Sequence, residues 1–327
     1  MEANQKSRII IYGLGVNFHN YVTQKVLDGL EKAYDIVGYA DKNPDVLRSD
    51  FLEKYNRYTD ISECVYDYIC ITSSKYYEDI KEELEKQGVQ SEKILPREFW
   101  MEFCLNTMLP MDRLSGRGLE IGGPSKIFRT IYHTCYACDG VNYDKETVWG
   151  SNVGEKYVWE DRELGSQIIA DATDLNMVAD ATYDFVISSN NLEHIANPLK
   201  AIRESIRVLK SGGVLVILVP CKKYTFDHRR SVTTFEHILE DYKKNVAEDD
   251  LMHLPEILKM HDLAMDPAAG NEEEFKNRSL ENYKNRCLHH HVYSEELLES
   301  IASYFKLKVL ENTEWCRNYY FVFEKVK

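Results

Sequence analysis

The sequence predicts an α/β protein made of two successive units in which strands alternate with helices. Its 327 residues suffice for two domains of ordinary size. Short apolar runs alternate with longer segments whose apolar residues recur at helical spacing, a pattern typical of parallel sheets covered by helices. Two of the apolar runs end in glycine turns, IYGLG at 11–15 and GLEIGGPS at 118–125. Such turns commonly begin nucleotide-binding α/β domains.

The first unit is predicted to contain a small parallel sheet. Its strands are expected at Arg8–Tyr12, Asp35–Ala40, Asp67–Thr72 and Lys93–Leu95. Helices are expected at Phe18–Lys32 and Tyr76–Gln87, where apolar residues recur every three or four positions. A further helix at Glu98–Met108 leads into a segment broken by proline and glycine. We therefore expect a first domain at 1–105 and a second at 106–327.

The first glycine turn is a weak indication of a ligand. The dinucleotide fingerprint requires a third glycine, and Phe18 stands in its place. Asp41, which ends the second strand, could contact a ribose or cap a helix. The pattern IYGLG…IVGYADKNP resembles small Rossmann-like domains found beside sugar-modifying enzymes. Three interpretations stay open: a nucleotide or sugar-nucleotide site, a docking or oligomerisation domain, and a nicotinamide site in a bifunctional enzyme.

The second unit is predicted to form a larger sheet. Its strands are expected at Leu119–Ile121, Gly140–Tyr143, Ile168–Ala170, Tyr183–Ser188, Val214–Val219, Lys306–Leu310 and Tyr319–Glu324. The last two should form a hairpin that adds an antiparallel strand. An amphipathic helix is expected at Leu199–Leu209, ended by Gly212 and Gly213. A polar, acidic segment at about 224–290 is interpreted as a helical lid inserted after the fifth strand.

The segment ADATDLNMVADATYDFVISSNNLEHIANPLKAIRESIRVLKSGGVLVILVP, residues 170–220, resembles the core of class I methyltransferases that use S-adenosylmethionine, nearest to the type-11 group. GLEIGGPS fits the first cofactor loop of that family. The resemblance implies an α/β fold of two Rossmann-like units, the second with a seven-stranded class I sheet. It also implies an enzyme with S-adenosylmethionine as its cofactor. Pro124, where the family usually has further glycines, removes one backbone donor from the loop.

The expected cofactor residues lie at the ends of the predicted strands, where open α/β sheets bind ligands. Glycine lets the backbone approach the ligand closely. The resemblance implies that Asn142, or else Asp144, contacts the ribose, and that Asp171 and Ala172 meet the adenine. The full set is Glu120, Gly122, Gly123, Asn142, Asp171, Ala172, Ser188 and Asn190.

The expected acceptor residues follow the fifth strand. The pattern FDHRR…TFEHILEDY, with the later HHV, resembles a subset of methyltransferases from surface-glycan and cell-envelope clusters. The set is Asp227, Arg229, Arg230, His237 and Asp241. Arginine suits a carboxylate or phosphate on the acceptor, and histidine can take a hydroxyl proton as methyl transfer proceeds. The candidate bases, in falling order, are His194, His290, His291 and His228.

Composition limits the partners. The net charge of −14 disfavours nucleic acid, and no apolar run is long enough to cross a membrane. We expect a cytoplasmic protein with free thiols and without a metal site. Its partner should be a small-molecule acceptor, and a hydroxyl of a sugar or a sugar nucleotide is favoured over an amine or a carboxylate. The protein could form a homo-oligomer. As an alternative to an enzyme, the sequence leaves open a non-catalytic scaffold with a degenerate methyltransferase fold.

Overall fold

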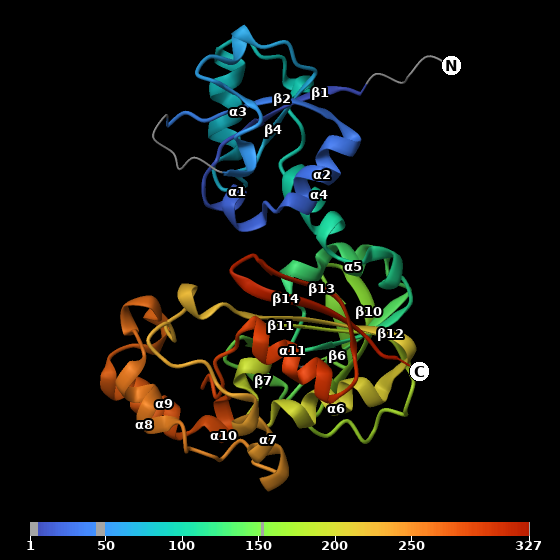
Figure 1. Cartoon of the computed structure of the whole chain (residues 1–327), viewed down its shortest axis with the longest axis vertical. Coiled ribbons are helices and arrows are strands. Elements are labelled where there is room, and N and C mark those ends of the chain that lie inside the picture. Colours follow the sequence, from blue (N-terminus) through green and yellow to red (C-terminus); the bar gives the residue numbers. More distant parts are fainter. Residues whose placement is uncertain (1–5, 44–49, 152–153, 327) are drawn as a thin grey trace. The chain divides into compact units, whose positions relative to one another are not determined.

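The computed structural model describes residues 6–43, 50–151 and 154–326. It divides the chain into two compact units, Met1–Pro110 and Met111–Lys327 (Figure 1). The division falls five residues after the boundary expected from the sequence, because helix α4 (Phe99–Met108) packs against α2 (Gln24–Ala33) of the first unit. Among the described residues, no helix is long and apolar enough to cross a membrane.

The first unit is a parallel sheet in the order β3-β2-β1-β4. Its strands are β1 (Arg8–Tyr12), β2 (Asp35–Ala40), β3 (Asn56–Tyr58) and β4 (Tyr68–Ile71). The remaining helices of the unit are α1 (Val16–Tyr21) and α3 (Tyr77–Lys86). The short polar strand β3 was not expected. The predicted strand at 93–95 is wrong, since only a single bridge between Ile94 and Ile69 forms there.

The predicted helix at Phe18–Lys32 is also wrong in one respect, because it is two helices. The hydroxyl of Thr23 accepts a hydrogen bond from the Val26 N–H, so it caps the start of α2 and ends the preceding helix. Threonine serves a helix start well and a helix interior poorly, because its hydroxyl competes for backbone groups.

The second unit contains an eight-stranded sheet in the order β13-β14-β12-β11-β5-β6-β10-β9. Strands β10, β6, β5, β11 and β12 are parallel, and β14 is antiparallel to both of its neighbours. The bounds are β5 (Arg117–Ile121), β6 (Ala137–Asn142), β9 (Lys156–Trp159), β10 (Arg162–Ile169), β11 (Tyr183–Ser189), β12 (Leu209–Pro220), β13 (Lys308–Trp315) and β14 (Asn318–Glu324). The seven predicted strands are all present, and β9 adds an unexpected antiparallel edge.

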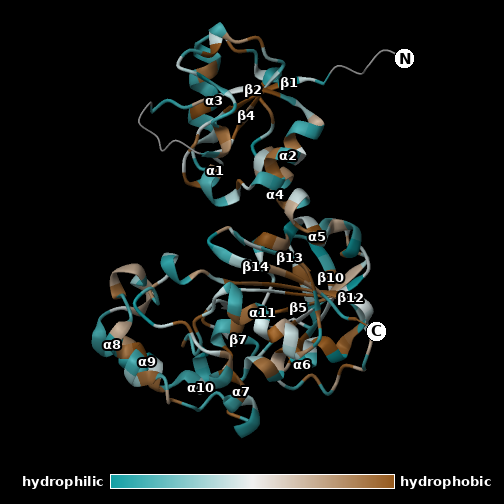
Figure 2. Cartoon of the chain, viewed as in Figure 1, coloured by the Kyte–Doolittle hydropathy of each residue, from teal (hydrophilic) through white to brown (hydrophobic). Residues whose placement is uncertain are grey.

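The burial of the central strand β12 indicates that this sheet is covered on both faces. Its apolar run, residues 214–219, is fully buried. Figure 2 shows hydrophobic residues concentrated in the strands of this sheet. Helix α6 (Pro198–Val208) presents Leu199, Ile202 and Val208 to the same core. It ends before Gly212 and Gly213, which lie within β12, so the predicted glycine stop is wrong.

The insertion after β12 is helical, as the sequence predicted. It contains α7 (Phe235–Lys244), α8 (Leu254–Met260), α9 (Glu272–Leu280) and α10 (Asn282–Asn285), and α11 (Glu295–Tyr304) follows it. A separate apolar cluster that includes Leu254, Ile257 and Phe275 holds α8 and α9 together. In Figure 1 these helices gather to one side of the second sheet. The smaller elements of this unit are α5 (Arg129–Thr134) and the hairpin β7–β8 (Glu146–Thr147 and Gly150–Ser151).

Candidate active site

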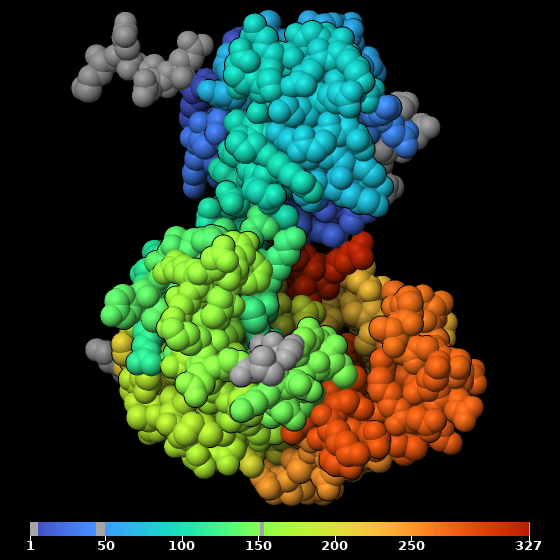
Figure 3. Space-filling view, turned by 180° about the vertical axis from the view of Figure 1, so that it is seen from behind, coloured from blue at the N-terminus to red at the C-terminus, as the bar shows by residue number. Residues whose placement is uncertain are grey.

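A cleft of about 1130 Å³ lies at the carboxyl ends of β5, β6 and β11, between the sheet and the insertion. Figure 3 shows the hollow between the green elements of the sheet and the orange insertion. Six of the expected cofactor residues line it: Gly122, Gly123, Asn142, Asp171, Ala172 and Asn190. The cleft is large enough for a nucleoside together with an acceptor.

The glycine turn after β5 forms one wall of the cleft. Gly122 has φ +83°, a backbone conformation that side chains rarely adopt. A Cβ atom on Gly122 would lie 2.5 Å from Nδ2 of Asn191, and one on Gly123 would lie 2.1 Å from Cδ of Glu120. Both positions therefore require glycine, and the turn leaves its backbone open to a ligand.

Glu120 does not contact the cleft, which corrects its expected role as a cofactor residue. Its side chain is fully buried beneath the turn. Its carboxylate accepts hydrogen bonds from the hydroxyl of Tyr157 at 2.7 Å, from the Ser125 N–H at 3.0 Å and from the Tyr132 hydroxyl. Burial raises the pKa of Glu120. The acid thus supports the turn from behind instead of meeting the ligand.

Asn142 lies at the expected ribose position. Its Nδ2 donates to the carbonyl of Gly123 at 3.1 Å, and the residue lines the cleft. Asp144 is exposed and accepts from the N–H of Lys145, so it does not replace Asn142. The amide therefore ties the end of β6 to the glycine turn.

Asp171 is shared between the cleft and the insertion. One of its oxygens accepts from both the N–H and the hydroxyl of Thr173, and the other lies 3.0 Å from a guanidinium nitrogen of Arg286. Burial would raise the pKa of Asp171, but the bonds from Thr173 and the charge of Arg286 hold that pKa below its ordinary value. Arg286 also stacks over the ring of Tyr143, with 5.2 Å between Cζ and the ring centre. The insertion therefore reaches the expected adenine end.

Ser188 does not line the cleft, which corrects its expected role as a cofactor residue. Its hydroxyl donates to the Ile121 carbonyl at 3.3 Å and is buried inside the sheet. Strand β11 runs one residue beyond its predicted end, so the cleft begins only at Ser189. The hydroxyl of Ser189 donates to Oδ1 of Asn190, and Nδ2 of Asn190 donates to Asn318 of β14, each at 3.0 Å.

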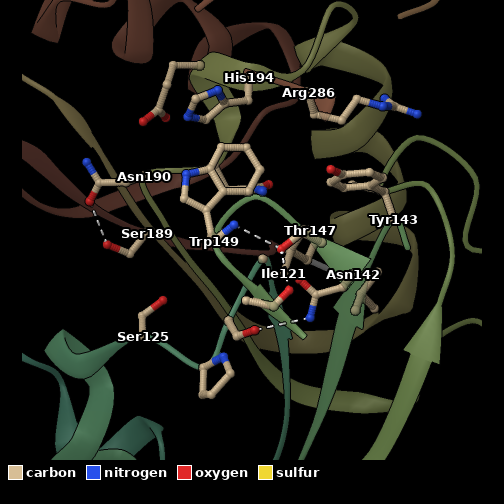
Figure 4. A pocket seen from close by; sticks show the side chains of 18 of the residues that line it. Ile121, Ser125, Asn142, Tyr143, Thr147, Trp149, Ser189, Asn190, His194 and Arg286 are labelled. Atoms are coloured by element: carbon tan, nitrogen blue, oxygen red, sulfur yellow. Dashed lines mark hydrogen bonds between the residues drawn. The ribbon is translucent and has the colours of Figure 1, made fainter. Parts of the chain in front are cut away.

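His194, the first candidate base, does line the cleft. Its ring centre lies 4.9 Å from that of Trp149 and 4.6 Å from that of His289. Figure 4 shows the indole of Trp149 beneath the imidazole of His194, with Asn190 to one side and Asn142 to the other. Burial lowers the pKa of His194, and burial raises the pKa of its neighbour Glu193 to about 7.

His289 is the functional candidate that sequence reasoning missed. It lines the cleft, and its Nδ1 is hydrogen-bonded to the carboxylate of Asp227, which is buried. Burial acts to lower the pKa of His289, but Asp227 and Glu193 outweigh it, so the pKa is raised. Arg230 donates to the other Asp227 oxygen at 3.1 Å and to the His289 carbonyl at 2.7 Å. Asp227 and Arg230 therefore position a histidine, and the cleft lining does not include either of them.

The other expected residues lie elsewhere. His290 is buried, and its Nε2 lies 2.9 Å from Nδ2 of Asn282. Arg229, about half exposed, pairs with Asp262 at 2.8 Å, and His228 contacts the same carboxylate. His237, Asp241 and His291 belong to a separate cluster that includes His253. None of these residues is part of the cleft lining, so the assignment of His290 and His291 as bases and of Arg229, His237 and Asp241 as acceptor contacts is corrected.

Besides His289, the lining residues that were missed include Glu193, Trp149 and Arg286. Glu193 immediately precedes His194, so its proximity was available from the sequence. Trp149 lies between the strands of the β7–β8 hairpin and Arg286 lies after α10. Neither position carries a periodic signal that could point to a site.

Comparison with known proteins separates the two units. Residues 119–217 match the family described as methyltransferase domain, and residues 5–95 match the one described as C2185-like, N-terminal. A search of curated proteins found no relative that matches this chain.

Solved structures similar to the chain include three S-adenosylmethionine-dependent methyltransferases. The one from Mesorhizobium loti has 13% identity and a TM-score of 0.41, with 69% of this chain and 95% of the other covered. The one from Methanosarcina mazei has 16% identity and a TM-score of 0.37, with 64% and 92% covered. The one from Aquifex aeolicus has 14% identity and a TM-score of 0.36, with 64% and 82% covered. Similarities this distant carry no argument about the acceptor.

Proposed function

The second unit is a class I methyltransferase domain that uses S-adenosylmethionine, and we propose that it transfers the methyl group to a hydroxyl of a sugar or sugar nucleotide. The observation that carries the proposal is the pair formed by His289 and Asp227 at the wall of the cleft. An alcohol is the acceptor that needs a base, because an amine must only arrive unprotonated and a carboxylate needs no proton removed.

The residues of the cleft fit this cofactor. The turn at Gly122 and Gly123 would receive the amino-acid tail, Asn142 the ribose, and Asp171 with the Ala172 backbone the adenine. Because Arg286 already occupies one oxygen of Asp171, the insertion would close over the adenosine end. When bound, S-adenosylmethionine supplies an electrophilic methyl group and leaves as a neutral thioether.

In the proposed reaction, His289 takes the proton of the acceptor hydroxyl at Nε2 while the oxygen forms its bond to the methyl carbon. Asp227, bonded to Nδ1, holds the tautomer that leaves Nε2 free and stabilises the imidazolium that forms. Arg230 donates to both Asp227 and the His289 carbonyl, so it fixes the position of the carboxylate relative to the histidine. His194, beside His289, orients the acceptor, and alignment of the reacting atoms supplies much of the rate.

The choice of a sugar is supported by the remaining lining. Trp149 is 59% exposed at the cleft and offers a flat ring against which the C–H face of a sugar can stack. Ser189, Asn190 and Thr225 provide hydroxyl and amide groups nearby. These neutral groups can both donate and accept hydrogen bonds, as the hydroxyls of a sugar require.

The proposal is tested by incubating the full chain with S-adenosylmethionine and a panel of free sugars and nucleotide sugars. Release of S-adenosylhomocysteine is followed by mass spectrometry, and the methylated position is assigned by NMR. An O-methyl sugar is the expected product. A product methylated on nitrogen or carboxylate would refute the hydroxyl acceptor.

A second outcome addresses the scaffold alternative. If the chain binds S-adenosylhomocysteine in calorimetry but yields no product with a broad panel of hydroxyl, amine and carboxylate acceptors, turnover is lost and the scaffold reading gains. If neither adenosyl ligand binds at millimolar concentration, the cofactor assignment itself fails.

A further inference from the structure

A second group of histidines lies in the insertion, apart from the cleft. We call it the His/Asp cluster, and it consists of His237, Asp241, His253 and His291. His237 and Asp241 are one turn apart on α7, His253 immediately precedes α8, and His291 lies in the extended segment before α11. The cluster thus joins three separate segments of the chain between residues 237 and 291.

The donor atoms of the cluster converge. One from each residue lies within 4.8 Å of all the others. Nε2 of His237 is 2.9 Å from Nε2 of His253 and 3.3 Å from Oδ2 of Asp241, and His291 approaches the same oxygen at 3.9 Å. The donors of a tetrahedral zinc site, with Zn–N bonds of about 2.0 Å, are about 3.3 Å apart. Small rotations of the four side chains would bring them to that spacing.

Two atoms of the cluster are left without a partner inside the protein. Oδ2 of Asp241, on a side chain that is 4% exposed, has no hydrogen-bond donor, although it faces His237 and His291. Nδ1 of His291 is also buried and unpartnered. Its Nε2 contacts the Ala196 carbonyl at 3.1 Å and is also the atom that lies 3.9 Å from Oδ2 of Asp241. His291 would therefore bind a metal either through Nδ1 or, after releasing the carbonyl, through Nε2. Buried polar atoms are normally hydrogen-bonded, so two unpartnered ones in the same cluster indicate that a binding partner, such as an ion, is absent.

We infer that the His/Asp cluster binds one zinc ion through three imidazoles and one carboxylate. This inference revises the expectation of no metal, and it does not depend on the proposed acceptor. Imidazole and carboxylate are both zinc ligands, and four protein ligands close a tetrahedral site, so the ion is structural. Glu193, His194 and His289 also bring donor atoms within 4.8 Å, but they are only three donors, and they line the cleft that the proposed reaction uses.

The position of the cluster indicates which segments the zinc ion would hold together. It would tie α7 and the start of α8 to the segment that contains His291. His289, two residues earlier in that segment, lines the cleft. The ion would therefore hold the insertion in the arrangement that keeps His289 and Asp227 together.

The test measures the metal content of the full chain, purified without a histidine tag from cells grown with zinc and analysed by plasma mass spectrometry. About one zinc ion per chain is expected. H253A and D241N should fall below about 0.1 zinc per chain, and their melting temperature should drop by about 10 °C. H133A, at an exposed histidine on α5, is the matched control and should keep the metal.

E193Q separates the two groups of donors, since the zinc should stay in this variant. For variants that do not fold, the wild-type chain is stripped with a chelator and titrated with Co²⁺, whose tetrahedral complexes absorb strongly in the visible. A wild-type chain that contains no zinc and binds neither Zn²⁺ nor Co²⁺ more tightly than about 10 µM would overturn the inference. Zinc that persists in H253A and D241N, or that disappears in E193Q, would overturn it as well.

Discussion

The two glycine turns of the chain are locally alike and differ in their surroundings. Gly13 and Gly122 both follow the first strand of a parallel sheet, with φ of +88° and +83°. In each unit the end of the next strand is bonded back to the turn. In the first unit a carboxylate oxygen of Asp41 accepts from the Leu14 N–H at 2.6 Å, whereas in the second Nδ2 of Asn142 donates to the Gly123 carbonyl at 3.1 Å.

The direction of these bonds separates the two turns. Asp41 accepts from a backbone N–H of its turn and from the Asn43 N–H, so the protein itself supplies the anion that such a turn attracts. Asn142 donates instead and brings no anion to its turn, in which the Gly122 N–H is bonded to the Val141 carbonyl and the Ser125 N–H to Glu120. The second turn also opens into the cleft, which the insertion after β12 completes. A glycine turn alone is therefore not enough to form a ligand-binding site. The segments packed around the turn decide whether a ligand can bind there.

The largest effect should come from the cleft of the second unit. H289A should lower kcat by about 10²–10⁴-fold, because the acceptor proton loses its base. The affinity for S-adenosylhomocysteine should stay within about twofold, since His289 is assigned to the acceptor. Initial rates and calorimetry measure the two quantities, with H133A as the control. A normal kcat in H289A would shift the role of base to His194.

Alanine substitutions at the two glycines compare the turns directly. In G122A the new Cβ would meet Asn191 at 2.5 Å, and the positive φ adds strain. We expect S-adenosylhomocysteine affinity to fall by about 100-fold, which corresponds to about 2.7 kcal/mol. G13A suffers the same strain, but its nearest neighbour is 3.7 Å away, and its cofactor affinity should match that of the wild type. Equal losses in both variants would contradict the assignment of the cofactor to the second turn.

Arg286 tests whether the insertion helps to retain the cofactor. It lies 3.0 Å from both Asp171 and Glu248, so R286A would release the insertion from the sheet. Dissociation of S-adenosylhomocysteine, followed by stopped-flow fluorescence, should accelerate by about tenfold. R229A removes an arginine of the same insertion that pairs away from the cleft, and it should leave the rate unchanged.

The first unit should respond to nucleotides weakly or not at all. Titration of the full chain with NADH at up to millimolar concentration should change neither fluorescence nor melting temperature, because Asp41 already occupies the turn. If D41A binds a nucleotide that the wild type does not bind, the Asp41 carboxylate is what prevents nucleotide binding at this turn. Binding by the wild type would instead restore the nucleotide-site or bifunctional interpretation of this domain.

The smallest expected effect concerns the stability of the first unit against acid. Hydrogen bonds from the side chain and the backbone N–H of Arg8 lower the pKa of Asp67 to about 2. The carboxylate therefore stabilises the fold above its unfolded pKa of about 3.9, and this contribution is lost as the pH falls toward 2. D67N should melt about 2 °C below the wild type at pH 6, and the difference should shrink between pH 4 and pH 2. A difference that grows on acidification would contradict this sign.

The sequence by itself determined the α/β class, the positions of most strands and the methyltransferase domain. Apolar runs such as residues 214–219 and helical spacing such as that of 198–208 are local patterns, and parallel strands bring their carboxyl ends to one edge. Gly122, Asn142 and Asp171 could be placed at the cleft for that reason. Glu120 and Ser188 could not, because the direction of a side chain near the end of a strand depends on its neighbours across the sheet.

Only the tertiary structure decided where the histidines lie. His289, His290 and His291 are consecutive, yet they face the cleft, Asn282 and the His/Asp cluster. Their segment has no regular secondary structure, so no periodicity assigns its side chains to a face. Their partners include Ala196, which is 95 positions from His291, and Asp227, which is 62 positions from His289. Long-range packing alone selects such contacts, and for this reason the acceptor site could not be predicted from the sequence.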